Sequence, residues 1–329
     1  MIDAPGPWGT GPFVLSEGIS TLDTRSPEVI LLPNKDYWNP DRLPKARIVY
    51  DNAIPRAEAI ASVASGDGRV DVVNDLSIAE ARAFKGGDKA KLRSQRAKTV
   101  LTGLFNRNKA GSPWNDEAVR RALNMAVDRD ALVEKGADGH GVVMPALIQV
   151  GRYGADPGMK PYARDVTAAA DGIAKAGLKG REILVLASPD WEDVVKVLTD
   201  NLAEVGLTVK ADFSKAAVDP ADWDIKLLWY FDWSPQYPVG VVHREFFGGN
   251  GAFRSGPEDE GFDALYAKLL KTPHQPAQEE VVREVERYVY DHALGLFLFS
   301  PHTLFAVSDR VSFTAYDTCM SELAETYVK

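Results

Sequence analysis

The stretch that most constrains the fold is Leu104–Asp130, where an apolar run that begins at Val100 leads through a polar loop into an amphipathic helix. Residues 100–105 (VLTGLF) are apolar and β-prone, which predicts a buried strand. Asn115 is a favourable N-cap residue and two acidic residues follow it, so we expect a helix to begin there. Its apolar residues recur at helical spacing, which predicts one buried stripe and places Arg120 and Asn124 off that stripe.

The rest of the chain repeats this alternation of β-prone runs and amphipathic helices, with short connections. Strands are expected at residues 9–15, 28–34, 46–50, 69–76, 89–105, 182–187, 207–213, 224–230 and 294–307. Helices are expected at residues 55–65, 77–84, 165–177, 191–206, 262–270 and 278–293. Such an alternation predicts an α/β fold.

Four motifs occur in a fixed order along nearly the whole chain. They are WGTGPF at residues 8–13, LLPNKDYW at 31–38, D-x-x-VRRALNMAVDRDAL at 116–132 and YFDWSPQYP at 230–238. Together these motifs resemble the extracellular solute-binding proteins of family 5, which are the peptide, dipeptide and nickel binding proteins of ABC importers.

The resemblance implies a type II periplasmic-binding-protein-like architecture, with two α/β lobes that close about a ligand. The lobes would be joined by crossing strands near Phe105 and near residues 298–301. We expect residues 1–105 to form a partial first lobe, residues 106–293 the second, ligand-binding lobe, and residues 294–329 the return to the first lobe.

The resemblance also implies an exported, periplasmic protein that is longer than this chain. The GTGPF turn begins at residue 9, whereas it lies well inside the family's chains, so we expect the N-terminal part of such a protein to be missing. Residues 1–8 have neither the basic start nor the apolar core of a signal peptide.

Composition narrows the partners and the chemistry. The 38 basic and 47 acidic residues give a net charge of −9, which argues against nucleic acid and anionic membrane partners. Cys319 is the only cysteine and no apolar run is long enough to span a membrane, so neither an internal disulfide nor membrane insertion is expected.

No nucleophile, base and orienting group can be recognised together, so we expect no catalytic residue, metal ligand or cofactor. Asp222 and Asp224 could pair on one strand face, but solvated loop positions are the favoured interpretation.

Aromatic residues concentrate between Trp229 and Tyr237. Trp229 and Phe231 belong to an expected strand, and packing in the lobe core is favoured for them over exposure to a ligand. Trp233 and Tyr237 belong to a loop with two prolines, so exposure to a ligand cleft is favoured there.

The resemblance makes this loop the ligand-facing wall, with an altered polar specificity. Gln236 and Val239 stand where the family motif has aspartates, one of which is associated with the ligand's ammonium group in peptide-binding relatives. Asp232 could substitute for that charge, and Arg244 could meet an anionic group instead. The candidate ligand-binding residues are Trp233, Gln236, Tyr237, Asp232, Arg244, Phe105 and Asn106.

The function that the resemblance predicts is the substrate-binding component of an ABC importer. It would capture a peptide-like or similar polar solute and deliver it to the permease membrane subunits without catalysis. A hydrolase acting on peptides or glycosides is the alternative from another class, but its motifs are not found. The ligand-sensing module of a regulator is a second alternative, which a DNA-binding segment would favour and neighbouring permease genes would oppose.

Overall fold

The computed structural model describes residues 9–21, 23–214, 222–231, 240–248, 251–253, 255–257, 259–317 and 323–329, with the side chains of 231 and 240–242 excepted. The chain divides into two compact units. Unit 1 contains residues 1–95 and 303–329, and unit 2 contains residues 96–302. Among the described residues, no helix has the length and apolar character needed to cross a membrane.

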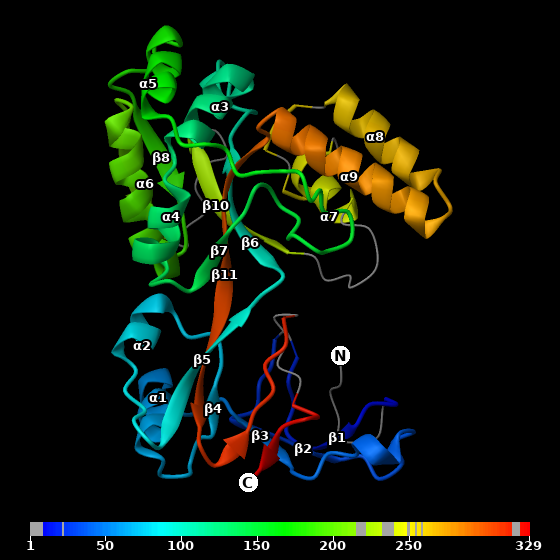
Figure 1. The fold of residues 1–329 in the computed structure, drawn as a ribbon. Coiled ribbons are helices and arrows are strands. Elements are labelled where there is room, and N and C mark those ends of the chain that lie inside the picture. The colour runs from blue at the N-terminus through cyan, green and yellow to red at the C-terminus, as the bar shows by residue number, and fades with distance from the viewer. Residues whose placement is uncertain are drawn as a thin grey trace. The chain divides into compact units, whose positions relative to one another are not determined.

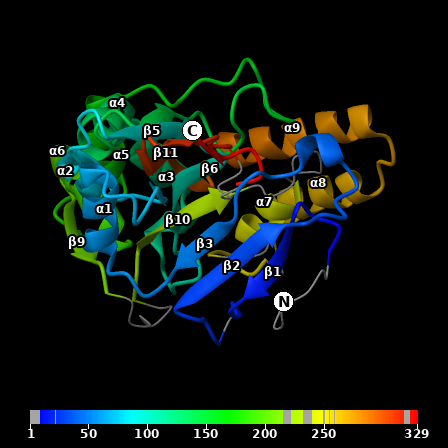
Figure 2. The same cartoon turned by 90° about the horizontal axis from the view of Figure 1, so that it is seen from below.

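Unit 1 contains a three-stranded antiparallel sheet. Its strands β1 (Phe13–Glu17), β2 (Glu28–Pro33) and β3 (Ile48–Asp51) pair in that order (Figure 2). These strands fall where the short β-prone runs predicted them. The β2 strand buries Val29 and Ile30 but leaves Leu32 exposed.

The rest of unit 1 consists of short helices and strands. Its elements are α1 (Arg56–Ser65), β4 (Val72–Val73), α2 (Ile78–Ala83), β5 (Ala90–Arg96), β12 (Val311–Ser312) and β13 (Tyr327–Val328). Gly66 ends α1 with a φ of 66°, as a left-handed C-cap glycine does. Ser77 and Glu80 form a capping box at the start of α2. Both helix ends confirm the sequence prediction.

A central sheet organises unit 2. Its strands are β6 (Thr99–Phe105), β7 (Gly141–Val143), β8 (Glu182–Leu186), β9 (Thr208–Asp212), β10 (Ile225–Phe231) and the first part of β11 (Gly295–Ser308). The order is β11-β6-β10-β8-β9, and β7 pairs with β11. The β10 strand is antiparallel to β6 along its length, whereas it is parallel to β8 only at Ile225 and Lys226.

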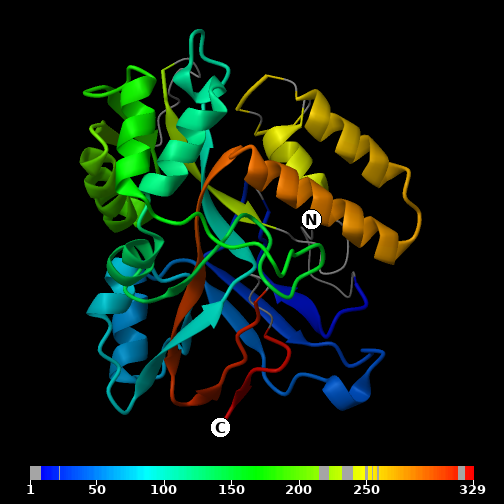
Figure 3. The ribbon, with the colours of Figure 1, turned by 45° about the horizontal axis from the view of Figure 1, so that its top comes forward.

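Helices flank this sheet on two sides (Figure 1). On one side lie α3 (Glu117–Ala126), α4 (Arg129–Ala131), α5 (Val166–Lys175) and α6 (Glu192–Glu204). On the other lie α7 (Gly240–Phe247), α8 (Glu260–Leu270) and α9 (Gln275–Asp291). The helices α8 and α9 run alongside each other (Figure 3), and their apolar faces join one core with Tyr230, Phe246 and Phe297.

The helix predicted to start at Asn115 begins one residue later. Asp116 is the N-cap and accepts a hydrogen bond from the Ala118 N–H, while Asn115 belongs to a preceding 3₁₀ turn. The predicted exposure of Arg120 and Asn124 is wrong, because both are buried. The Arg120 guanidinium donates to the carbonyls of four residues, namely Trp114, Asn115, His292 and Ala293. Burial lowers its pKa to about 10.

The chain passes between the units at residues 95–96 and 302–303, not near Phe105 and 298–301 as expected. The long strand expected over residues 89–105 is divided into β5 and β6. The units also differ from the expected lobe boundaries at 105 and 293, because β6 pairs throughout with β10 and with the start of β11. The second passage lies inside β11, which is continuous through residues 295–308.

Candidate ligand-binding face

The β10 strand presents different side chains to its two faces. Ile225 and Leu227 are buried on one face, and Trp229 on that same face is 42% exposed. The expectation that Trp229 packs in the core is therefore wrong. The reason is that β8 pairs only with the first two residues of β10, so Trp229 lies beyond the end of that neighbour.

An aromatic base supports Trp229. Its ring lies 5.2 Å from that of Trp191, at an interplanar angle of 57°. Trp191 is buried at the end of a 3₁₀ turn that leads into α6, and its ring meets Phe299 of β11 edge-on at 6.3 Å. We call Trp191, Trp229 and Phe299 the aromatic face. An exposed indole held by buried aromatic rings offers a rigid apolar surface at low entropic cost, which suits ligand contact.

The opposite face of β10 carries a buried polar network. The Tyr230 hydroxyl lies 2.7 Å from Nδ1 of His243 on α7. The Nε2 atom of His243 lies 2.5 Å from Oε2 of Glu286 on α9. All three residues are at most 1% exposed. We call Tyr230, His243 and Glu286 the His243 network.

The geometry of Glu286 orients this network. Its Oε1 atom accepts the N–H groups of Leu147 and Ile148, both at 2.7 Å. A carboxylate only accepts, so the Nε2 atom of His243 carries the hydrogen that points to Glu286. In the neutral ring Nδ1 is then the acceptor for the Tyr230 hydroxyl. The network therefore links β10, α7, α9 and residues 147–148 by one connected set of hydrogen bonds.

Comparison with known proteins assigns the family. The family model described as bacterial extracellular solute-binding proteins, family 5 Middle, matches residues 3–251. The chain belongs to this family. The resemblance seen in the sequence is thus confirmed.

Individual family 5 relatives agree with this assignment. The probable D,D-dipeptide-binding periplasmic protein DdpA of Escherichia coli (strain K12) is 24% identical over 328 residues, which are 96% of this chain and 61% of that protein. The chain therefore spans about three fifths of the length of this relative. The nickel-binding periplasmic protein of the same organism is 28% identical over 173 residues, 52% of this chain and 32% of that protein.

Solved structures confirm the expected fold class, the α/β two-lobe type. The ABC transporter substrate-binding protein CtaP of Listeria monocytogenes matches with a TM-score of 0.80 and 16% identity, over 97% of this chain and 67% of that chain. NikA of Brucella suis, in complex with Fe(III)-EDTA, matches with a TM-score of 0.77 and 20% identity, over 98% of this chain and 68% of that chain.

Two of the candidate residues of this family 5 chain are internal. Phe105 is fully buried and stacks on Trp114 at 5.8 Å. Asn106 is also buried, and its side-chain amide donates to the Trp223 carbonyl at 2.9 Å. In this structure their side chains anchor the end of β6, and a contact to ligand remains a prediction.

Arg244 lies on α7, one residue after His243. Its guanidinium is 3.0 Å from the carboxylate of Glu245 and lies over the ring of Tyr266 at 5.7 Å. An anionic ligand group would therefore compete with Glu245 for this cation. The remaining candidates, Asp232, Trp233, Gln236 and Tyr237, lie outside the described residues.

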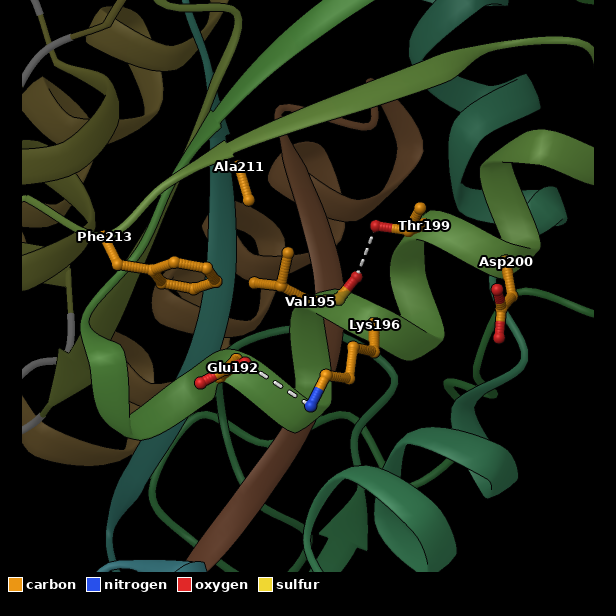
Figure 4. Close-up of a pocket in the computed structure, with 7 residues that line it drawn as sticks. All are labelled: Glu192, Val195, Lys196, Thr199, Asp200, Ala211 and Phe213. Atoms are coloured by element: carbon orange, nitrogen blue, oxygen red, sulfur yellow. Dashed lines mark hydrogen bonds and ion pairs between the residues drawn. The ribbon is translucent and has the colours of Figure 1, made fainter.

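A shallow groove of about 210 Å³ occurs elsewhere in unit 2, between α6 and β9 (Figure 4). Its lining residues are Glu192, Val195, Lys196, Thr199, Asp200, Ala211 and Phe213. Lys196 pairs with Glu192 at 3.4 Å, and the Thr199 hydroxyl donates to the Val195 carbonyl at 2.8 Å (Figure 4). These polar groups are engaged within α6, so we do not include the groove in the candidate site.

Sequence reasoning missed three buried residues whose side chains form hydrogen bonds inside unit 2. Asp224, expected to be solvated, is buried and accepts the Trp114 indole N–H at 3.1 Å and the Leu184 N–H at 2.9 Å. His243 and Glu286 are far apart in sequence and carry no shared motif. The one available signal was that Glu286 falls on the apolar stripe of α9, between Val285 and Val289.

Proposed function

We propose that this chain is the substrate-binding component of an ABC importer, or a large part of it. It captures a peptide-like or similarly sized polar solute, delivers it to the permease membrane subunits and catalyses no reaction. The observation that carries the proposal is membership of family 5 over residues 3–251. The names of the relatives, which include di/tripeptide-binding protein 1 of Pseudomonas aeruginosa, support a peptide-like solute. Their periplasmic designation supports the same location for this protein.

We assign the solute contact in unit 2 to the aromatic face, with Trp229 as its exposed member. An indole that is 42% exposed retains apolar surface that a ligand can still bury. Trp233, Gln236 and Tyr237 are proposed as further solute contacts, because they belong to the family motif. Units 1 and 2 would then correspond to the two lobes.

The decisive experiment is native mass spectrometry of the full-length protein purified without refolding, followed by calorimetry with two probes. The probes are L-methionyl-L-leucine and its N-acetyl derivative. We expect an intact peptide-like solute to be released on denaturation, and the probes to be recovered unchanged after incubation. Hydrolysis of a probe, or a protein that binds neither probe and carries no solute, would refute the proposed function.

A pair of tryptophan variants tests the site. Trp229→Ala should weaken binding of the tighter probe about tenfold, because an aromatic contact and its buried area are lost. Trp38→Ala is the matched control, since Trp38 is 73% exposed in unit 1 and is not one of the assigned solute contacts. Equal losses in the two variants would remove the aromatic face from the binding site.

A further inference from the structure

The His243 network has a particular position in the chain. Tyr230 directly follows Trp229 at the end of β10, and Arg244 directly follows His243 in the middle of α7. The network therefore holds, by one connected set of hydrogen bonds, the residues next to two candidate ligand contacts.

The network is also attached to the strand that leaves unit 2. Glu286 binds the N–H groups of Leu147 and Ile148, and the next residue, Gln149, donates to the Ser300 hydroxyl of β11 at 2.7 Å. The β7 strand of the same segment pairs with β11 at residues 299–301. Tyr230 and His243 are thus connected through Glu286 to the central sheet as well as to α9.

Apolar packing alone would not fix the orientation of the Tyr230 and His243 side chains. The Tyr230 ring already packs on Phe246 at 5.2 Å and meets the His243 ring edge-on at 5.2 Å. Hydrogen bonds in surroundings without water add a defined length and angle, and breaking one leaves a costly buried polar group. The contacts of 2.7 Å and 2.5 Å at the two ring nitrogens of His243 fix the ring between two elements.

We propose that Tyr230, His243 and Glu286 are positioning residues, which hold the end of β10 and the helix α7 so that Trp229 and Arg244 are presented to the solute in one arrangement. The inference rests on the proposed function for the identity of the solute. The holding of β10 and α7 is a property of the ligand-free protein and can be measured separately.

The test uses two conservative variants of the full-length protein. Tyr230→Phe removes the hydroxyl and keeps the ring. Glu286→Gln keeps the shape, but its amide nitrogen cannot accept from Nε2 of His243, so the ring must change tautomer. The control is Ile173→Val or Ile173→Ala on α5, whichever lowers Tm by the same amount, because Ile173 is buried and belongs to a different helix.

Two readouts separate positioning from stability. Hydrogen–deuterium exchange of residues 225–231 and 240–247, without ligand, should rise in both network variants and stay unchanged in the control at equal Tm. The Kd of N-acetyl-L-methionyl-L-leucine should rise about tenfold in the network variants and remain unchanged in the control.

Two results in the network variants would overturn the positioning role. One is an exchange increase spread evenly over unit 2, and the other is an unchanged Kd in a variant whose exchange rises locally. If the unmutated protein binds neither dipeptide probe, the proposed solute class fails. The exchange data then decide the inference alone, with a local increase supporting it and a uniform one refuting it.

Discussion

Asn124 provides the sharpest test of how unit 2 is held together. Its side chain is fully buried in α3 and forms four hydrogen bonds. The amide nitrogen donates to the carbonyls of Arg120 and Gly295, at 3.1 and 3.0 Å. The amide oxygen accepts the Phe297 N–H at 3.0 Å and an N–H of Arg129 at 3.1 Å.

Replacing Asn124 by alanine would break these bonds at once. Two backbone groups of β11, the Gly295 carbonyl and the Phe297 N–H, would each lose a hydrogen-bond partner. Arg129 would lose one of its acceptors. A buried polar group left without its partner costs about 1–3 kcal/mol, and such losses in one network do not add fully. We therefore expect Asn124→Ala to lower the free energy of unfolding by about 3–5 kcal/mol.

The assay is urea-induced unfolding followed by tryptophan fluorescence, with Asn115→Ala as the matched control. Asn115 is the same residue type, lies just before α3 and is exposed. Its replacement should change the unfolding free energy by less than about 0.5 kcal/mol. If the Asn124 variant loses no more stability than the Asn115 variant, the amide is not a structural bridge and our account of the buried network is wrong.

Three further predictions concern other polar groups. Asp224→Ala should cost about 2–4 kcal/mol in urea unfolding, because two buried N–H groups lose their acceptor, whereas Asp222→Ala, at an exposed position, should be nearly neutral. The side-chain hydrogen bond from Arg56 lowers the pKa of Glu80, so its contribution to stability is present above the unfolded pKa and lost as the pH falls through the lower folded value. The difference in unfolding free energy between the unmutated protein and Glu80→Gln should accordingly shrink below about pH 4, and a difference that is independent of pH would contradict this. Gln236→Asp should reverse the probe preference in calorimetry, so that free L-methionyl-L-leucine gains about tenfold over the N-acetylated form, because a carboxylate can pair with the ammonium group; an unchanged ratio would exclude Gln236 from that role.

The positions of helices and strands were largely predictable, because most depend on local apolar periodicity and on caps. Ser77 and Gly66 are examples, since their helix-end roles follow from residue type alone. The division between β5 and β6 was not predictable, because residues 89–105 form one β-prone run and the break is set by which strands each half pairs with. The helix α7 was missed as well, and the buried His243 lies on it.

The candidate site was less predictable than the fold. Alternation along β10 gives the face of Trp229, but its exposure depends on where β8 ends, which is a property of the assembled sheet. Likewise, the burial of Arg120 depends on carbonyls at residues 292–293, more than 170 positions away in sequence. Hydrophobic periodicity carries no information about such distant hydrogen-bond partners.

Glu286 points to a signal that periodicity analysis can use, and Asn124 shows where that signal is absent. Glu286 is a polar residue on the otherwise apolar stripe of α9, whereas Asn124 lies off the apolar stripe of α3 and is buried all the same. Burying a polar side chain is unfavourable unless it is hydrogen-bonded, so such a residue is tolerated where distant backbone groups need a partner. Asn124 binds the backbone of Gly295 and Phe297, and Glu286 binds the N–H groups of residues 147–148. Gly295 and Phe297 lie at the start of β11, and residues 147–148 follow β7, which pairs with β11. A lone polar residue on an apolar helix stripe, such as Glu286, therefore predicts a buried anchor for distant backbone groups, and in this chain that anchor holds residues 147–148, which follow the strand β7 that pairs with β11.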